Sequence, residues 1–521
     1  MASPSPPAER PVTVGAAICS SAGAFSWLSN AGIVKLNLIL VLPLISSYAT
    51  GFDGSMITAC SHSTSGRASS TTPALRSLAY EDSTPHEFAF LNAIQNVGQL
   101  VALPFYAIAC DRFGRRPALV FSASVLLIGV ALQGAAQNTA MFIAARGILG
   151  LGLALNITAA PLLLLELAYP RQQAPMVGLY NSLWSLGALS AAWITFGTFR
   201  IGSDWSWRIP SLLQGVSSVV QILLCWLIEE SPRWLLSKGR DEEARSLIAK
   251  YHANGDDAEP LVTIEMKEIR TALYLEEQFN AATSYMSFFQ TKGNRSRFFI
   301  ILAVGFFSQW SGNGLISYYL TLILDSIGYK AEGTQTLINA LMTVWGMIWS
   351  VFFSAIVNRF SRRTLFLTST IGCLVVYIIW TALEATYEQQ TALDGTGNGG
   401  AAKASGGRLS KVTYVVEILP FNMRARGLVL YNLFVALALI FNQYVNPIGV
   451  TNSGWKYYIM YDVWLAFEVV VVYFLFVETG NLSLEETAAV LDGEEYKDKL
   501  VEGAAANAEK QMKLQDEVAV R

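Results

Sequence analysis

The sequence predicts an all-α polytopic membrane protein, and three observations support this fold class. The chain of 521 residues is 53% hydrophobic and only 14% charged, whereas soluble domains carry about 25% charged residues. Apolar runs of about 20 residues, the length that crosses a bilayer as a helix, recur along the chain. Short motifs also repeat between the two halves. Because backbone groups in lipid must be satisfied within the segment, the apolar runs are predicted to be helices.

Eleven membrane spans are predicted, and a long charged segment separates the sixth from the seventh. They lie at residues 36–57, 88–109, 117–136, 140–165, 176–198, 209–229, 298–320, 335–357, 364–384, 428–449 and 457–477. We therefore expect an N-terminal tail at 1–35, a first bundle at 36–229, a linker with short helices at 230–297, a second bundle at 298–477 and a C-terminal tail at 478–521.

The linker contains a segment, "GRDEEARSLIAKYHANGD", with the pattern of an amphipathic helix. Acidic residues occupy its start, where they complement the helix dipole. Ala244, Leu247, Ile248 and Tyr251 form one apolar stripe.

Basic residues gather in the connections after the even-numbered spans, in "DRFGRR", "EESPRWLLSKGR" and "NRFSRR". The positive-inside rule places such connections in the cytoplasm. The prediction is a multi-pass protein of the plasma membrane, with both termini cytoplasmic if twelve spans are present.

The two halves repeat at matching positions, which predicts two pseudo-symmetric six-helix bundles. "DRFGRR" follows the second span and "NRFSRR" the eighth; Glu166 follows the fourth span as Glu417 should follow the tenth. A Gly/Ala/Ser/Lys tract stands where that tenth span is expected. The tenth span is therefore predicted to be short or missing, degraded near 399–420.

Asp53 in the first span and Arg146 in the fourth are ionisable residues within apolar segments. Such residues are costly in a membrane and usually functional. A carboxylate facing an arginine can alternate between a paired and a protonated state, which couples a proton to a conformational change. The alternative is a static structural ion pair.

Amide side chains recur at helical spacing in three spans. Gln309 and Asn313 are four residues apart, as are Asn442 and Asn446, and the second span contributes Asn92, Gln95 and Asn96. Near tryptophans and tyrosines, neutral amides suit a polyhydroxyl ligand; the alternative is hydrogen bonding between helices. Glu468 is an acidic residue in the last predicted span, at 457–477. It is either functional or hydrogen-bonded to a neighbouring helix, and neither interpretation is favoured.

No pattern points to an enzyme. Five scattered cysteines lack metal-ligand spacing, and the glycines after Arg146 follow no strand, which excludes a nucleotide loop. We expect no cofactor and no metal. A net charge of -3 gives no indication of nucleic-acid binding.

The chain resembles the sugar-porter branch of the major facilitator superfamily in five motifs that occur in order: "DRFGRR", "SDWSWRIP", "EESPRWLLSKGR", "QWSGNGLISYYL" and "EILPFNMRARG". "LYNSLW", "SGNGLISYYL" and "FNQYVNP" are most similar to fungal lactose and cellobiose permeases. The resemblance implies a major facilitator fold and proton-coupled sugar uptake by alternating access. The fifth span lacks the glutamine that hexose porters carry, which argues against a simple hexose site.

The resemblance also assigns residues. It implies that Asp53 and Arg146 form the proton-coupling pair. Together with the amide pattern, it gives the candidate sugar-binding residues Asn96, Asn181, Trp184, Gln309, Asn313, Tyr318, Tyr319, Asn442, Gln443 and Asn446. It implies a cytoplasmic gate of Asp111, Arg112, Gly114, Arg115, Arg116, Glu166, Glu230, Arg233, Arg359, Arg362, Arg363, Glu417, Arg424 and Glu478.

The leading function is therefore transmembrane uptake of a di- or oligosaccharide together with protons, by a monomer embedded in the lipid bilayer. A passive hexose facilitator is the alternative within transport. A sugar sensor, or a transport-defective derivative with a damaged tenth span, is the alternative from another class.

Overall fold

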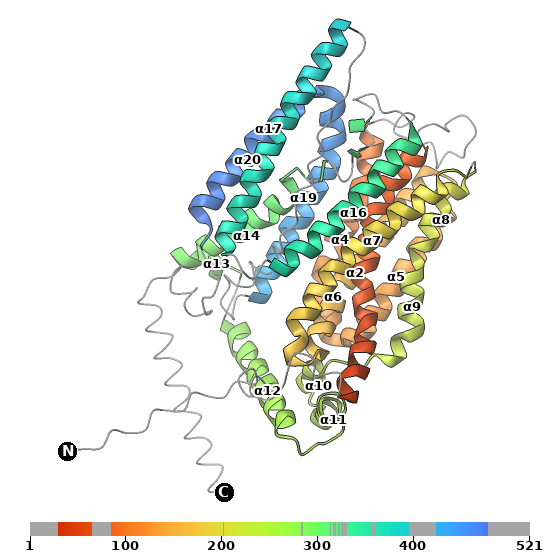
Figure 1. Ribbon diagram of the computed structural model, residues 1–521. Helices are drawn as coiled ribbons and strands as arrows, with labels where there is room; N and C mark the ends of the chain where they lie inside the picture. Colours follow the sequence, from red (N-terminus) through yellow and green to blue (C-terminus); the bar gives the residue numbers. More distant parts are fainter. Residues whose placement is uncertain are drawn as a thin grey trace, which may run out of the picture. The chain divides into compact units, whose positions relative to one another are not determined.

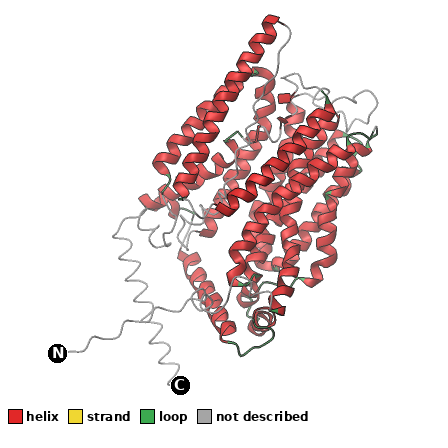
Figure 2. Ribbon diagram, in the orientation of Figure 1, coloured by secondary structure: helices red, strands yellow, loops and turns green. Residues whose placement is uncertain are grey.

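The computed structural model describes residues 30–64, 85–201, 203–282, 285–312, 314–315, 319–320, 323–324, 331–356, 361–394 and 424–477. All regular elements in these ranges are helices (Figure 2). This confirms the predicted all-α class. The tract at 399–420, where we predicted a short or missing tenth span, lies outside the described residues.

Helices lie at all of the predicted spans (Figure 1). In the first half they are α2 (Ala31–Thr64), α4 (Pro85–Phe113), α5 (Arg115–Gly134), α6 (Thr139–Leu167), α7 (Gln173–Thr198), and the series α8 (Trp205–Leu213), α9 (Gly215–Leu224) and η3 (Cys225–Leu227). In the second they are α14 (Lys292–Trp310), α16 (Glu332–Ile356), α17 (Arg362–Asp394), α19 (Arg424–Ser453) and α20 (Lys456–Leu475). Among the described residues, 8 helical stretches are long and apolar enough to cross a membrane.

Two helices differ by about ten residues at one end from their predicted bounds. α17 continues to Asp394, about ten residues beyond the predicted span, because its polar end is rich in residues of high helix propensity. α14 ends at Trp310 with Ser311 as its C-cap, inside the predicted span at 298–320. The apolar pattern locates the membrane-crossing part of a helix and does not locate such ends.

The chain divides into two compact units by its internal contacts. The first comprises residues 1–277 and 329–348, and the second comprises residues 278–328 and 349–521. In the first unit, α6 is the central helix: it packs extensively on α5 and α4 and also contacts α2 and α7. α2 in turn packs along α7. The helix that carries Arg146 is therefore surrounded by its neighbours.

The close approach of α4 and α6 depends on small residues. A Cβ atom added at Gly150 would collide with the backbone carbonyl of Gln95, and one at Gly98 would collide with that of Gly147. Small residues allow helix backbones to approach closely in membranes. This contact brings the side chain of Gln95 within reach of Arg146.

The linker packs against the other helices of the first unit. It forms α10 (Pro232–Ser237), α11 (Asp241–His252) and α12 (Pro260–Ala282). The predicted stripe of α11 is buried, and it joins one hydrophobic core with α2, α6 and α12. The linker helices are therefore an integral part of this unit.

In the second unit, α14 packs on α19 and α17 packs on α20. Its helices are less buried than those of the first: 22% of the most apolar window of α17 is buried, compared with 50% for α5. α5 is covered mainly by α6, the fourth span. The span that would correspond to α6 in the second unit falls in the tract outside the described residues.

Enlarging Gly150 should separate α4 from α6. We expect Gly150→Leu to lower the thermal midpoint by about 3 to 10 °C, since overpacking against backbone cannot relax by a rotamer change. Gly178→Leu is the matched control, because a Cβ there meets nothing within 4 Å. Scanning fluorimetry of the purified protein measures both; equal midpoints would contradict this packing.

Candidate functional site

Asp53 and Arg146 form a buried ion pair in the first unit. Asp53 of α2 is 1% exposed and Arg146 of α6 is 3% exposed. The Nη1 atom of Arg146 lies 3.1 Å from Oδ1 of Asp53. The two residues that the sequence singled out are 93 positions apart in the chain, and the fold brings them into direct contact. Their functional role remains a prediction.

Two glutamines complete the site. The amide of Gln95 donates to Oδ2 of Asp53, and its carbonyl oxygen accepts from Nη2 of Arg146. Gln214, between α8 and α9, donates to Oδ1 of Asp53. Both side chains are buried. The carboxylate thus accepts from one cation and two neutral amides, contributed by helices α2, α4, α6 and the α8–α9 junction.

The sequence analysis placed Gln95 among the amides of the second span and did not single out Gln214, which lies in an apolar stretch without a motif. The available signal was an amide inside a membrane span. That signal does not say which other helix the amide faces.

The arrangement has a definite chemical capability. An ionised carboxylate in a buried site requires an opposite charge and hydrogen-bond donors, which Arg146 and the glutamines supply. The four side chains therefore tie α2 to α6 through a buried, hydrogen-bonded ion pair.

The other candidate residues of the first unit have different surroundings. Asn96 is buried at 6% exposure, Asn181 is exposed on α7, and Trp184 is half-buried. The backbone of Trp184 approaches α2 so closely that a Cβ at Gly51 would collide with it. Trp184 thus lies at the α2–α7 contact, and Asn181 does not join the Asp53 cluster.

In the second unit, the paired asparagines of α19 meet two tyrosines of α20. Tyr461 donates to Oδ1 of Asn446 at 2.7 Å and lies 3.1 Å from Oδ1 of Asn442. Tyr457 donates to Oδ1 of Asn446 at 2.9 Å, and the amide of Asn446 donates to Asn442. The amide oxygens are thereby engaged, which orients the amide N–H groups. The tyrosines were not predicted.

The end of α14 is held by the same cluster. The amide of Asn442 donates to the carbonyl of Gln309 at 3.0 Å, and the hydroxyl of Tyr377 donates to that of Gly312 at 2.5 Å. Carbonyls at a helix end have no partner within the helix. Side chains of α19 and α17 supply these partners, so the end of the seventh span is tied to both helices.

The remaining sugar-binding candidates of this unit lie nearby or outside the described residues. The hydroxyl of the buried Tyr319 donates to the carbonyl of Gln443 at 2.5 Å. Asn313 and Tyr318 lie outside the described residues. The structure thus brings Gln309, Tyr319, Gln443 and the two asparagines of α19 into one hydrogen-bonded region.

Glu468 is fully buried on α20 and bonds neighbouring groups. It accepts from Nε1 of Trp464 at 2.8 Å and from the hydroxyl of Ser311 at 3.1 Å. Ser311 is the C-cap of α14. Glu468 therefore bonds a neighbouring helix directly, which is one of the two expected interpretations. This contact holds α20 against the end of α14.

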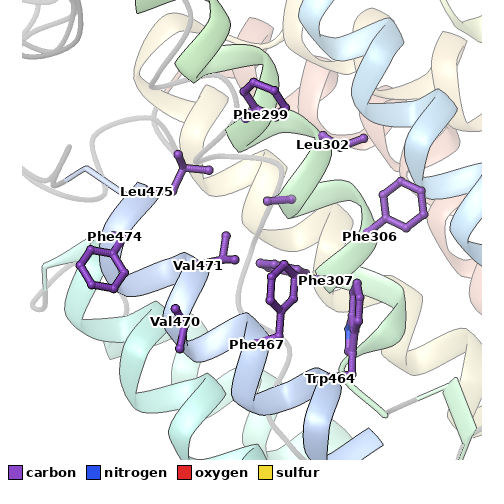
Figure 3. A pocket seen from close by; sticks show the side chains of 11 residues that line it. Phe299, Leu302, Phe306, Phe307, Trp464, Phe467, Val470, Val471, Phe474 and Leu475 are labelled. Atoms are coloured by element: carbon purple, nitrogen blue, oxygen red, sulfur yellow. The ribbon is translucent and has the colours of Figure 1, made fainter. Parts of the chain in front are cut away.

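A pocket of about 440 Å³ lies beside this region, between α14 and α20 (Figure 3). Its lining is apolar and rich in phenylalanine: Phe299, Leu302, Ala303, Phe306, Phe307, Trp464, Phe467, Val470, Val471, Phe474 and Leu475. A sugar requires hydrogen-bond partners for its hydroxyl groups. This pocket is therefore unsuited to a sugar.

The first-half gate residues converge at the start of α5. Arg115 binds Glu166 of α6 through Nε at 3.0 Å and Nη2 at 3.3 Å. Glu230 accepts from the backbone N–H groups of Arg115 and Arg116 and from that of Ser231. A carboxylate at a helix N-terminus satisfies free N–H groups and the helix dipole.

Gly114 makes this contact possible. Its φ of 102° lies in the left-handed region that favours glycine, and a Cβ there would collide with the carboxylate of Glu230. Burial raises the pKa of Glu230, while hydrogen bonds from the three backbone N–H groups and the charge of Arg115 act in the opposite direction. Burial outweighs the donors, so this carboxyl is easier to protonate than an exposed glutamate.

The start of α17 repeats part of this arrangement. α5 begins at Arg115 and α17 at Arg362, matching positions of "DRFGRR" and "NRFSRR". The guanidinium of Arg116 lies 5.7 Å from the ring of Trp226, and that of Arg363 lies 5.5 Å from the ring of Tyr473. Each arginine thus covers an aromatic ring near the end of the last span of its half.

Other gate candidates contribute less or lie outside the described residues. Asp111 is exposed and lies 3.5 Å from Arg115, and its carbonyl accepts from Trp234. Arg112 is exposed, and Arg233 and Arg362 are half-buried. The rest are not described at the level of side chains: Arg359, Glu417, Arg424 and Glu478.

Two solved structures that share this arrangement of helices are of the transporter XylE. The chain matches the inward-open xylose transporter XylE from E. coli with a TM-score of 0.67 and 19% identity, over 87% of this chain and 99% of that one. XylE bound to 6-bromo-6-deoxy-D-glucose, described as a major facilitator superfamily proton:xylose symporter, gives the same TM-score over 88% of this chain and 99% of that one, again at 19% identity. The fold is therefore that of a major facilitator superfamily transporter.

The family model described as "Sugar (and other) transporter" matches residues 38–491. The chain therefore belongs to this family, the sugar porters of the major facilitator superfamily. It is similar to the MFS-type transporter criB of Aspergillus cristatus, with 27% identity over 73% of this chain and 80% of that one. It is also similar to high-affinity glucose transporter 1 of Candida albicans, with 27% identity over 76% of each. These relatives are transporters rather than enzymes, in agreement with the sequence analysis.

Removing the Glu230 carboxyl should destabilise the first unit. We expect Glu230→Ala to cost about 1 to 3 kcal/mol, because three backbone N–H groups lose their acceptor. Glu230→Gln keeps one acceptor oxygen and should cost less. Denaturant unfolding of the purified protein followed by tryptophan fluorescence measures both costs.

The free energy of unfolding should depend on pH differently in the wild type and in Glu230→Gln. Since burial raises the folded-state pKa of Glu230, ionisation costs stability, and that cost develops as the pH rises from the ordinary glutamate range through the raised value. The advantage of the wild type over Glu230→Gln should shrink across this window. An advantage that grows with pH would show that the donors outweigh burial.

Proposed function

We propose that the protein takes up a di- or oligosaccharide together with protons by alternating access. The observation that carries this proposal is the buried cluster of Asp53, Arg146, Gln95 and Gln214. It joins a titratable group to two helices whose relative positions can depend on its protonation. Membership in the sugar porter family supplies the transport function.

In the proposed cycle, Asp53 alternates between a state paired with Arg146 and a protonated state. With Asp53 ionised, Arg146 holds α6 against α2. A proton that enters from outside neutralises Asp53 and releases this tie, which permits the change between outward and inward states. When the proton leaves inside, Arg146 binds the carboxylate again. The glutamines bond both forms and keep the carboxyl in place.

The proposed sugar contacts centre on the amide and tyrosine cluster of the second unit. Asn442 and Asn446 retain N–H groups whose direction is set by Tyr457 and Tyr461. Preorganised donors bind hydroxyl groups at a smaller entropic cost than mobile ones. The absence of a glutamine from the fifth span, and the motifs shared with lactose and cellobiose permeases, favour a sugar larger than a hexose.

The gate of Arg115, Glu166 and Glu230 is proposed to lie on the cytoplasmic side, as the clustered arginines indicate. Its contacts join the ends of α5, α6 and the sixth span. Such contacts stabilise a state closed to the cytoplasm, and they must break in the inward-open state. The plasma membrane and a monomeric state complete the proposal.

Asp53→Asn tests proton coupling, because asparagine keeps the size of Asp53 and one of its two acceptor oxygens but cannot carry the proton. In proteoliposomes, we expect sugar accumulation driven by a pH gradient to fall at least about tenfold, since an essential proton carrier contributes factors of this size or more. Exchange of labelled for unlabelled sugar across the membrane should persist.

Asp204→Asn is the matched control, because that aspartate forms a partly exposed pair with Arg208 outside the cluster. Cells that express the wild type should alkalinise their medium when sugar is added. Confirmed sugar uptake without a pH change would contradict symport and favour a passive facilitator.

Tyr461→Phe tests the sugar site. We expect KM for the transported sugar to rise about five- to tenfold, since one orienting hydrogen bond of ordinary strength is lost. Tyr274→Phe, an exposed tyrosine on α12, is the control. Uptake of a labelled panel of disaccharides and hexoses identifies the substrate; an unchanged KM for it in Tyr461→Phe would exclude this cluster from sugar binding.

A further inference from the structure

A large pocket of the first unit takes no part in the transport mechanism above. Its volume is about 830 Å³, and it lies where the linker helices α10 and α11 meet the start of α5 and the end of the sixth span. The charged side chains of its lining come from the linker, the end of the sixth span and the start of α5, whereas α5 beyond Arg116 supplies none. The pocket therefore has a charged end and an uncharged end.

The uncharged end follows one face of α5, a helix long and apolar enough to cross the membrane. It is lined by Pro117, Val120, Phe121 and Ser124. These are positions i, i+3, i+4 and i+7 of one helix face, and they span about 10 Å along the helix axis. Phe121 is 60% exposed, so this face points away from the helix bundle. The hydroxyl of Ser124 donates to the carbonyl of Val120 at 2.8 Å. This end of the pocket therefore suits a hydrocarbon chain.

The charged end has equal numbers of basic and acidic side chains, which are Arg116, Arg240, Lys250, Glu229, Glu230 and Glu243. The carboxylates would repel a ligand of net negative charge, and the cations would repel one of net positive charge. Arg240 pairs with Glu243 at 2.5 Å, and Lys250 pairs with Glu229 at 2.6 Å. These four side chains are 37 to 56% exposed, so they remain accessible to a ligand. The charges therefore match a ligand whose own positive and negative groups sum to zero.

Arg116 provides a cation that has no carboxylate partner for its side chain in the described part of the chain. Its backbone N–H binds Glu230, while its guanidinium lies 5.7 Å from the ring centroid of Trp226. Trp226 is 81% exposed, as is typical of a tryptophan at a membrane–water interface. An arginine beside an aromatic face keeps its N–H groups available, and their planar arrangement matches a phosphate. The charged end thus offers a phosphate site next to an interfacial tryptophan.

We propose that this pocket binds a phospholipid with a zwitterionic headgroup. The phosphate lies at the guanidinium of Arg116, the ammonium group faces the carboxylates of Glu229 and Glu243, and one acyl chain follows the uncharged face of α5. A sterol would leave the charged end unmatched, because its only polar group is a hydroxyl. An anionic phospholipid would lack the positive group that faces the carboxylates. The bound lipid joins α5 to the linker helices and is separate from the proposed sugar and proton sites.

Native mass spectrometry of the full-length protein in detergent measures lipid binding directly. Phosphatidylethanolamine and phosphatidylglycerol with the same acyl chains are the two probes. We expect the first molecule of phosphatidylethanolamine to bind about fivefold more tightly than phosphatidylglycerol, a ratio that corresponds to one exposed charge contact. Equal affinities, or tighter binding of phosphatidylglycerol, would overturn the proposal. Displacement of phosphatidylethanolamine by ergosterol would assign the pocket to a sterol and would also overturn it.

Two variants locate the bound lipid within the pocket. Arg116→Gln removes the cation at one end, and Phe121→Ala removes exposed apolar surface at the other. Each should weaken phosphatidylethanolamine binding about fivefold. The matched controls are Arg112→Gln, an exposed arginine close by in the chain, and Ile128→Ala, which is 56% exposed on the same face of α5. Neither control residue lines the pocket. Wild-type affinity in both pocket variants, or an equal loss in the controls, would contradict this site.

The lipid measurement requires neither sugar nor a proton gradient, so it is independent of the proposed function. Failure of the lipid to bind would leave the transport proposal intact. Conversely, Asp53→Asn should bind phosphatidylethanolamine as the wild type does, whatever its effect on transport. A changed lipid affinity in Asp53→Asn would show that binding reports general loosening of the first unit, and it would overturn the assignment to this pocket.

Discussion

The buried carboxylate of Asp53 imposes the main constraint on the first unit. A charge within an apolar bundle requires an opposite charge and hydrogen-bond donors from the protein, because water is not available to replace them. Four segments must therefore converge on this point, and they can do so only if their backbones approach closely. The glycines between α4 and α6 meet that requirement. The central position of α6 and the small residues on its surface both follow from placing a cation beside this carboxylate.

The second unit meets a related demand without a cation among its described amide contacts. Asn442 and Asn446 are satisfied by tyrosines, by each other and by the carbonyl at the end of α14. Neutral groups of this kind can exchange partners at a small cost. The cluster around Asp53 thus contains an ion pair, whereas the cluster around Asn442 and Asn446 is built from neutral donors and acceptors.

The sequence predicted the parts of this structure that depend on one residue or one helix. Ionisable residues in apolar spans identified Asp53 and Arg146, and the amphipathic stripe identified α11. It did not predict contacts that depend on which helices pack together. Gln214 has no distinguishing neighbours in the sequence, and the tyrosines of α20 gain meaning only beside α19. The end of α14 was missed because hydropathy is continuous across Ser311 while the backbone is not.

The paired contacts of Arg116 with Trp226 and of Arg363 with Tyr473 have a consequence for the bilayer. Aromatic rings and the heads of long basic side chains favour the headgroup layer over both water and hydrocarbon. Each contact joins the start of one span to the end of another. In the proposed orientation both contacts lie at that layer, so a membrane of different thickness is expected to pull on the arginine turns that begin α5 and α17.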